Sequence, residues 1–252
     1  MNVGLRIDID SIADAVAIPD LLDTLEKYDS KATFFITTGP DETLRNAFHY
    51  SGKNIYKIPL KRYIPGLCQS ILKKHVEAHR NLKLLLDSSH EIGLHGYMHY
   101  EWMNFLDRKS KEDISGMISK GSDLFEHEFG YKPGCFASPG FKTSDLFLIA
   151  LDEFGFDYSS DFYGNRIFYP EVKNHKQKTP QVPVSLPSLC ELPGDGNEIL
   201  GRIKEICGGK YSVFYIHPSC DPIFRKNLFE IILKFVGGTK TLSEIYENSS
   251  DI

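Results

Sequence analysis

The sequence contains few cysteines, and none of them forms a close pair. The five lie far apart along the 252 residues, at Cys68, Cys135, Cys190, Cys207 and Cys220. An odd and scattered set does not favour a secreted disulfide framework, and the lack of a C-x-x-C motif does not favour a structural zinc site. The cysteine pattern therefore predicts reduced thiols in a cytoplasmic protein.

Long apolar runs and an excess of positive charge are also missing. No stretch of 18 apolar residues occurs, so no membrane-spanning helix is predicted. The first residues lack the basic and apolar regions of a signal peptide, which again favours the cytoplasm. Lys and Arg number 29 against 34 Asp and Glu, giving a formal net charge of −5. A general nucleic-acid-binding protein would have a strong basic excess, so no nucleic-acid partner is expected.

What the chain does contain is a regular alternation of strand and helix patterns. β-Branched and apolar runs predict strands at residues 3–9, 32–37, 91–95, 134–138, 157–160, 182–186 and 211–217. Helical spacing of apolar residues predicts helices at residues 18–28, 111–129, 144–154, 197–207 and 224–236. This predicts an α/β fold of parallel strands, and about seven units favour a barrel, although an open sheet has the same local pattern. No linker or repeat interrupts the pattern, so residues 1–252 are expected to form a single domain.

Two carboxylates lie at the end of the first predicted strand. In the run Arg6-Ile7-Asp8-Ile9-Asp10, side chains alternate, so Arg6, Asp8 and Asp10 point to one face. Burying two neighbouring carboxylates is costly unless a cation compensates them. Active sites of parallel α/β folds gather at the carboxyl ends of strands, which favours a functional role. The alternative is a pair of capping residues with Arg6 as a counter-ion.

Three histidines follow the ends of other predicted strands. His95 and His99 come after the third strand, and a helical turn would put both on one face. Gly96 stands where a zinc-protease motif requires Glu, so that motif is excluded. His217 closes the last predicted strand and would face the same rim.

Together these five residues fit metal-assisted hydrolysis of an acyl group. Two His and one carboxylate leave metal positions open for water and substrate, and a bound metal lowers the pKa of its water. The spare carboxylate can act as general base, and a histidine across the pocket as general acid. The alternative is five unrelated polar residues at strand ends.

These motifs resemble the polysaccharide deacetylases, carbohydrate esterase family four, and most closely their deformylase branch. That branch acts on 4-deoxy-4-formamido-L-arabinose carried on undecaprenyl phosphate. The resemblance spans residues 3 to about 220, nearly the whole chain. It rests on residues 3–10, 32–35 with 39–41, 91–99, 157–161, 179–187 and 216–218.

The resemblance implies a distorted (β/α)7 barrel and assigns roles to the site residues. The implied metal ligands are Asp10, His95 and His99. The implied catalytic base is Asp8, the implied acid is His217, and Asp161 resembles the carboxylate that orients this histidine. The divalent metal is expected to be Zn²⁺, with Fe²⁺, Co²⁺ and Mn²⁺ as alternatives.

The sequence departs from the family pattern in two places. The two Asp are usually adjacent, whereas Ile9 separates Asp8 from Asp10, which leaves open which is base and which is ligand. The Arg that precedes a Pro in the family's third motif is absent from residues 136–140. We hypothesise that Arg6 supplies the missing charge beside Asp8.

One segment differs from the rest of the chain in charge. Residues 43–75 contain seven Lys or Arg and no Asp or Glu, with three Tyr, one Phe and four Ile. A lipid-carried sugar phosphate would favour positive charge and interfacial aromatic residues beside the site. We expect peripheral contact with the inner face of an anionic cytoplasmic membrane here. The alternative is a solvated excursion over the barrel.

The expected function is hydrolysis of a linear amide: removal of an N-acyl group, in particular formyl, from a polyprenyl-phosphate-linked aminoarabinose. The nearest alternatives are an N-acetylglucosamine deacetylase and a hydrolase of non-sugar amides or cyclic imides. A glycosidase that uses Asp8 and Asp10 would not depend on metal. A sugar- or lipid-binding module would lack hydrolysis altogether.

Overall fold

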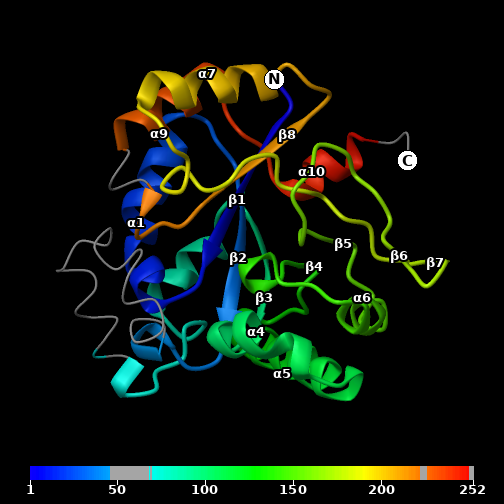
Figure 1. Cartoon of the computed structure of the whole chain (residues 1–252). Helices are drawn as coiled ribbons and strands as arrows, with labels where there is room; N and C mark the ends of the chain where they lie inside the picture. The colour runs from blue at the N-terminus through cyan, green and yellow to red at the C-terminus, as the bar shows by residue number, and fades with distance from the viewer. Residues whose placement is uncertain (46–67, 69, 222–225, 250–252) are drawn as a thin grey trace.

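The computed structural model describes residues 1–45, 68, 70–221 and 226–249 (Figure 1). Its centre is a six-stranded sheet in the order β5-β4-β3-β2-β1-β8, and every neighbouring pair is parallel. The strands are β1 (Val3–Ile9), β2 (Thr33–Thr38), β3 (Glu91–Tyr97), β4 (Cys135–Phe136), β5 (Tyr158–Ser159) and β8 (Ser212–Ile216). The alternation of strands and helices in the sequence thus predicted both the strand direction and the α/β class correctly.

The sixth predicted strand, residues 182–186, does not form a regular strand. The segment 181–186 makes isolated parallel bridges to both edges of the sheet: Gln181 to Ser159 at β5 and Leu186 to Phe214 at β8. Backbone bonds from Val182 N–H to Ser159 O and from Ser185 N–H to Val213 O accompany these bridges. The segment therefore connects the two edges of the curved sheet without completing a regular barrel strand.

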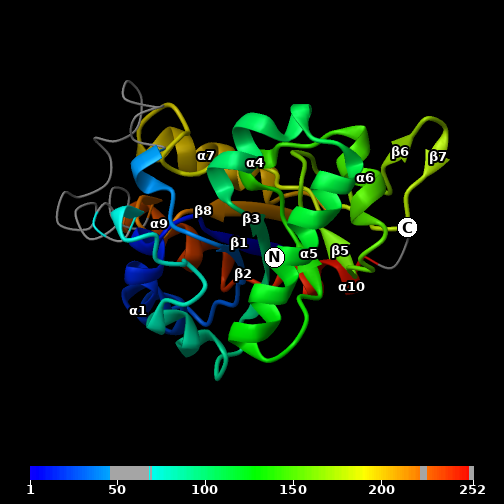
Figure 2. The ribbon, with the colours of Figure 1, turned by 90° about the horizontal axis from the view of Figure 1, so that it is seen from below.

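Helices cover the outside of the sheet in both views (Figures 1 and 2). A short antiparallel hairpin of β6 (Glu171–Val172) and β7 (His175–Lys176) projects away from the body. The sequence did not predict the hairpin, nor the helices α4 and α10. The α-helices are α1 (Ile12–Lys27), α4 (His99–Phe105), α5 (Lys111–Phe129), α6 (Asp145–Leu151), α7 (Gly196–Ile206), α9 (Lys226–Val236) and α10 (Leu242–Glu247).

Helix α1 begins six residues earlier than predicted and continues through Pro19. It starts at a capping box in which Ser11 and Asp14 satisfy each other's backbone N–H groups. Pro19 has no N–H to bond the carbonyl of Ala15. The Asn81 side chain donates to that carbonyl at 3.1 Å, so a tertiary contact replaces the missing helical bond.

The core packs on both faces of the central strands. All seven residues of β1 are buried. Leu5, Ile7 and Ile9 face the covering helices, while Arg6 and Asp8 face the barrel interior. This arrangement brings the carboxyl ends of β1, β3 and β8 to one rim, where polar side chains can meet.

Most of the basic segment 43–75 lies outside the described residues. No helix in the described ranges is long and apolar enough to cross a bilayer.

Candidate active site

The three predicted metal ligands meet at the carboxyl ends of β1 and β3. Asp10 follows β1 directly, His95 lies in β3 and His99 is the first residue of α4. The Asp10 Oδ1 atom lies 3.2 Å from His95 Nε2 and 3.3 Å from His99 Nε2. One ligand atom from each residue lies within 4.8 Å of the others, a spacing that suits ligands around one cation.

Hydrogen bonding around this cluster leaves potential metal ligands directed at one another. His95 Nδ1 lies 2.9 Å from the carbonyl oxygen of Ala137, which can only accept, so Nδ1 donates to it and Nε2 is the ring atom that faces the Asp10 carboxylate. Within the described ranges, the buried atoms Asp10 Oδ1 and His99 Nδ1 have no hydrogen-bond partner. Two imidazole nitrogens and an unpartnered carboxylate oxygen that converge in this way fit a divalent metal.

Two left-handed backbone positions bring the histidine rings together. Gly96 (φ 68°) and Met98 (φ 57°) turn the chain from β3 into α4, and the ring centroids of His95 and His99 lie 5.4 Å apart. A Cβ at position 96 would also contact Pro139 at 3.0 Å, which favours Gly there. The rings therefore converge across a strand-to-helix turn, not along one face of a helix.

Asp8 is held by a bidentate ion pair with Arg6. Arg6 Nε donates to Asp8 Oδ1 at 2.7 Å, and Arg6 Nη2 donates to Asp8 Oδ2 at 2.8 Å. Both side chains are buried; burial alone would lower the pKa of Arg6, but Asp8 raises it. The structure confirms that Arg6 supplies the positive charge expected beside Asp8. Asp8 Oδ2 lies 3.8 Å from His95 Nε2, next to the metal cluster.

His217 lies on the other side of Asp10. Its Nε2 is 3.4 Å from Asp10 Oδ2, and its Nδ1 is 3.7 Å from Asp221 Oδ2. Burial alone would lower the pKa of His217, but the Asp10 and Asp221 carboxylates raise it well above its usual value. Burial would likewise raise the pKa of Asp10, yet His99 and His217 hold it well below its usual range. Asp10 is thus the shared centre of the site.

Asp221 was not predicted from the sequence, and it anchors the loop that carries His217. Its carboxylate accepts the His217 backbone N–H at 2.7 Å and the Cys190 N–H at 2.6 Å. The Ser188 hydroxyl lies 2.7 and 2.8 Å from the two carboxylate oxygens. The signal was present in the sequence, because Asp221 follows His217 by four residues at the end of a strand.

Asp161 makes its contacts away from His217, the residue that it was expected to orient. Its carboxylate accepts hydrogen bonds from the Ser138 N–H at 2.7 Å, the Ser159 hydroxyl at 2.5 Å and the Gln181 amide at 2.9 Å. Burial raises its pKa, while these bonds and Arg6 oppose the shift. The expectation that Asp161 orients the His217 ring does not match these contacts, because the carboxylate beside His217 Nδ1 belongs to Asp221.

An aromatic wall joins Arg6 to His217. The Phe141 ring stacks on Tyr163 with centroids 4.4 Å apart, and the Arg6 guanidinium lies 4.4 Å from the Phe141 centroid. Tyr215 completes the wall, with its ring 5.1 Å from Phe141 and 5.4 Å from His217. Tyr163 is 50% exposed and presents a ring to solvent. The sequence gave no warning of this wall, because its members come from three distant segments.

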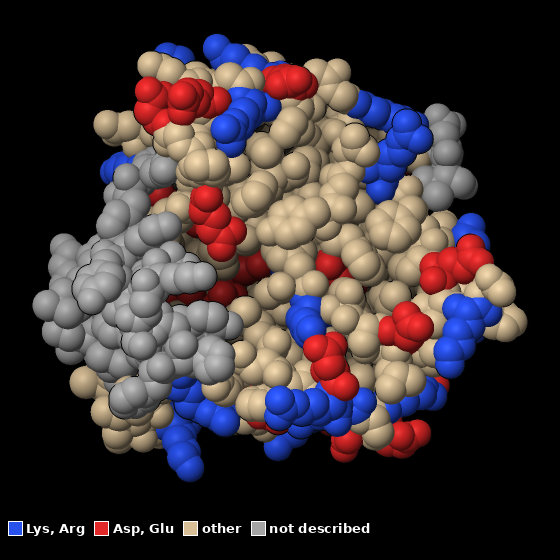
Figure 3. Space-filling model, viewed as in Figure 1, with Lys and Arg blue, Asp and Glu red and all other residues tan. Residues whose placement is uncertain are grey.

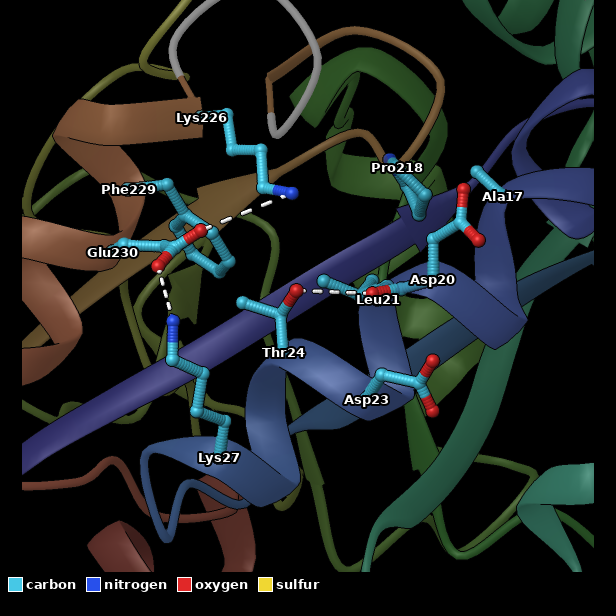
Figure 4. A pocket seen from close by; sticks show the side chains of 10 residues that line it. All are labelled: Ala17, Asp20, Leu21, Asp23, Thr24, Lys27, Pro218, Lys226, Phe229 and Glu230. Atoms are coloured by element: carbon cyan, nitrogen blue, oxygen red, sulfur yellow. Dashed lines mark hydrogen bonds and ion pairs between the residues drawn. The ribbon is translucent and has the colours of Figure 1, made fainter.

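The site is recessed from the molecular surface. Figure 3 shows acidic atoms deep in a hollow near the centre of the face in view. A separate cavity of about 500 Å³ lies between α1 and α9 (Figure 4). Glu230 at its edge pairs with Lys27 at 2.7 Å and with Lys226 at 4.0 Å. Pro218, the residue after His217, lines this cavity, but none of the six predicted site residues does.

The fold and the site define a β/α-barrel hydrolase with a cluster of Asp and His residues suited to a divalent cation. Comparison with known proteins agrees with this class. The polysaccharide deacetylase family matches residues 4–159 of the chain.

Two relatives carry the name "Probable 4-deoxy-4-formamido-L-arabinose-phosphoundecaprenol deformylase ArnD". The one from Wigglesworthia glossinidia brevipalpis is 33% identical over 235 residues, covering 86% of this chain and 82% of the relative. The one from Shewanella sediminis is 30% identical over 261 residues, covering 92% and 80%. The chain therefore belongs to the polysaccharide deacetylase family, and its predicted class, a hydrolase of carbon–nitrogen amide bonds, is confirmed.

Solved structures share the fold at low sequence identity. A Mycobacterium smegmatis protein assigned to the polysaccharide deacetylases superposes with a TM-score of 0.67 and 17% identity, covering 98% of this chain and 89% of that one. An acetyl xylan esterase of family 4 from Clostridium thermocellum, in complex with a cobalt ion, gives 0.53 and 19%, covering 98% and 91%. These similarities confirm the predicted architecture.

Proposed function

We propose that the protein removes the formyl group from a 4-formamido sugar carried on a polyprenyl phosphate, releasing formate and the free amine. The observation that carries this proposal is the arrangement around Asp10. One oxygen faces His95 and His99, the other faces His217, and the Asp8 carboxylate lies beside the same cluster. Relatives named as deformylases, aligned over at least 80% of both chains, support the formyl group and the sugar.

A divalent cation bound by Asp10, His95 and His99 would polarise the acyl carbonyl and stabilise the negative charge that develops on its oxygen. We assign this position to Zn²⁺, because two imidazoles and one carboxylate form a usual catalytic zinc set with open positions. Asp8 is the better base of the two carboxylates. Arg6 binds both of its oxygens from one side and fixes its position beside the cluster, whereas Asp10 faces the histidines.

The proton transfers then follow from the positions of Asp8 and His217. Asp8 accepts a proton from the attacking water molecule while the oxygen of that water bonds to the formyl carbon. His217 donates a proton from Nε2 to the amide nitrogen as the carbon–nitrogen bond breaks. Asp221 at 3.7 Å from Nδ1 favours the protonated ring and fixes its orientation, so it is the positioning residue for the acid.

The aromatic wall supports a sugar as the group that carries the amide. The exposed Tyr163 ring, backed by Phe141, offers a flat apolar surface of the kind that sugar rings contact. Phe141 itself has a φ of 55°, which non-glycine residues adopt rarely and which indicates a position held by its surroundings. The Arg6 guanidinium, 4.4 Å from the Phe141 centroid, contributes to that hold.

Exposed apolar and basic side chains at residues 71–74 support contact with a lipid carrier at a membrane surface. Ile71 and Leu72 are 65% and 64% exposed, and the next two residues, Lys73 and Lys74, are exposed as well. Exposed aliphatic residues beside lysines suit the interface of an anionic bilayer, where the apolar groups insert and the charges meet phosphate.

The proposal is tested by presenting zinc-loaded protein with four substrates: formylated and acetylated aminoarabinose, each with and without a polyprenyl-phosphate carrier. We expect release of formate from the lipid-linked formyl compound and at least about tenfold less product from its acetyl counterpart. Faster release of acetate from N-acetylglucosamine oligomers than of formate from any of these would overturn the proposed substrate. No hydrolysis with metal bound would overturn the proposed reaction.

A further inference from the structure

Two cysteines meet behind the loop that carries His217. Cys190 and Cys220 are 30 positions apart in the sequence, yet a ligand atom of each, with one of Asp221, lies within 4.8 Å of the others. The neighbouring Cys220 thiol and burial raise the pKa of Cys190. Neither cysteine has a role in the reaction proposed above.

Asp221 fixes the backbone on both sides of this pair. Its Oδ1 accepts the Cys190 N–H at 2.6 Å, and its Oδ2 accepts the His217 N–H at 2.7 Å. The Cys220 N–H in turn bonds to the His217 carbonyl at 3.0 Å. The Ser188 hydroxyl lies 2.7 and 2.8 Å from the two oxygens, so both carboxylate oxygens already accept hydrogen bonds from the protein. This favours a chemistry of the two sulfurs alone over a metal site that needs Asp221 as a ligand.

We propose that Cys190 and Cys220 form a reversible disulfide that controls the position of His217. With a low-molecular-weight disulfide such as oxidised glutathione as the oxidant, one thiolate attacks a glutathione sulfur and releases one reduced glutathione. The second cysteine then attacks the mixed disulfide and releases the other. Two protein thiols are oxidised to one disulfide, and one glutathione disulfide is reduced to two thiols.

A disulfide between Cys190 and Cys220 would change the active site, because the Asp221 carboxylate bonds both to Cys190 and to His217. A disulfide brings the two sulfurs from contact distance to about 2.05 Å and demands a defined dihedral angle. The shift has to be taken up by the 187–191 loop or by residues 217–221, and both are bonded to the Asp221 carboxylate. Glu191, next to Cys190, also accepts the Tyr215 hydroxyl at 2.9 Å, which extends the coupling to the aromatic wall.

The experiment equilibrates the metal-loaded protein in glutathione buffers of increasing oxidised fraction and maps disulfides by peptide mass spectrometry. We expect a linked peptide pair containing Cys190 and Cys220 and a mass lower by two hydrogens. We also expect the rate with the N-acyl sugar that the enzyme hydrolyses to fall about tenfold or more, since a displacement of about 1 Å in a catalytic group has effects of this order or larger. Dithiothreitol should restore both.

Matched variants separate this pair from the other thiols. Cys190→Ser and Cys220→Ser should be insensitive to oxidised glutathione, whereas Cys68→Ser and Cys207→Ser should respond like the parent protein. Histidine-selective ¹⁵N NMR gives a readout that does not depend on the substrate, and the His217 ring signals should shift on oxidation. No linked peptide at any glutathione ratio would overturn the proposal. A linked peptide with unchanged rate and unchanged His217 signals would also overturn it.

Discussion

The guanidinium of Arg6 donates hydrogen bonds of 2.7 and 2.8 Å to the two carboxylate oxygens of Asp8, which lies two residues further along the same strand. On β1 these side chains share the inward face, so the strand itself delivers the counter-ion to the carboxylate. Arg6 Nη1 reaches further, to the carbonyl of Ser160 beyond β5. One buried cation thereby fixes the Asp8 carboxylate and links two sides of the barrel.

The Arg6–Asp8 pair predicts a large loss of stability when only one partner is removed. Arg6→Met leaves a buried carboxylate without its counter-ion, and the free energy of unfolding should fall by about 3–5 kcal/mol. Urea denaturation measures this directly. The double variant Arg6→Met with Asp8→Leu should recover much of the loss, because no charge is then left unpaired. Equal stability of Arg6→Met and the parent protein would contradict a buried charge at Asp8.

The metal ligands and the proton-transfer residues should separate in an assay of metal content. His99→Ala removes a ligand, so zinc bound after dialysis should fall well below one per chain. Asp8→Asn and His217→Ala should keep zinc near one per chain and lose turnover by about 10²-fold or more, because each removes a proton-transfer group. Elemental analysis measures the zinc content of each variant, and the deformylation rate measures its turnover. Zinc lost from Asp8→Asn but kept in an Asp10→Asn variant would reverse the roles of the carboxylates.

Asp221 predicts a change in the pH dependence of turnover. In the proposed reaction His217 acts in its protonated form, so the rate should fall as the pH rises through the pKa of His217. Asp221 helps to raise that pKa, although burial alone would lower it. Asp221→Asn should therefore move the alkaline limb of kcat to lower pH, and a pH–rate profile measures the shift. Asp161→Asn is the matched comparison, because its contacts lie on the Arg6 side. A limb that moves in Asp161→Asn alone would restore the role first expected of Asp161.

The exposed ring of Tyr163 predicts an effect on substrate affinity. Tyr163→Ala should raise KM by about fivefold, corresponding to about 1 kcal/mol of lost ring contact, with a smaller change in kcat. Tyr163→Phe keeps the ring and should stay close to the parent protein. Tyr131→Ala, which alters a 42% exposed tyrosine packed on Phe125, serves as the control away from the site. An unchanged KM in Tyr163→Ala would exclude the ring as a sugar contact.

The exposed Ile71 and Leu72 predict binding to lipid vesicles. Binding should be stronger to anionic than to neutral vesicles at low salt and should weaken as salt is added, because lysines contribute to it. Replacing both residues by Ser should reduce binding to anionic vesicles by about tenfold, since two inserted aliphatic side chains are lost. Leu84→Ser, at another exposed leucine, is the control. Co-sedimentation that is equal for all three proteins would exclude insertion at this position.

Local sequence was sufficient to predict the bounds of elements whose residue pattern lies within the element itself. Helix α5 (Lys111–Phe129) was predicted with its bounds from the helical spacing of its apolar residues, and in the structure a Ser110–Asp113 capping box begins it and Gly130 ends it in a left-handed turn. The bounds of β1 were predicted equally well from its apolar content and alternation. The start of α1 was not, because Pro19 resembles a first-turn residue and only the distant Asn81 explains why the helix tolerates it.

For the site, the sequence by itself determined the chemical types and their positions at strand ends. Parallel strands share one rim, so Asp8, Asp10, His95, His99 and His217 could be expected to meet there. Tertiary structure alone decided the partners. The pairing of Cys190 with Cys220, the stack of Phe141 on Tyr163, and the bonds from Ser188 and Cys190 that hold Asp221 in place all depend on how loops from separate segments pack. Strand periodicity determines the face of the sheet to which a side chain points. Its neighbours depend on how the loops pack, and a local sequence pattern does not determine that packing.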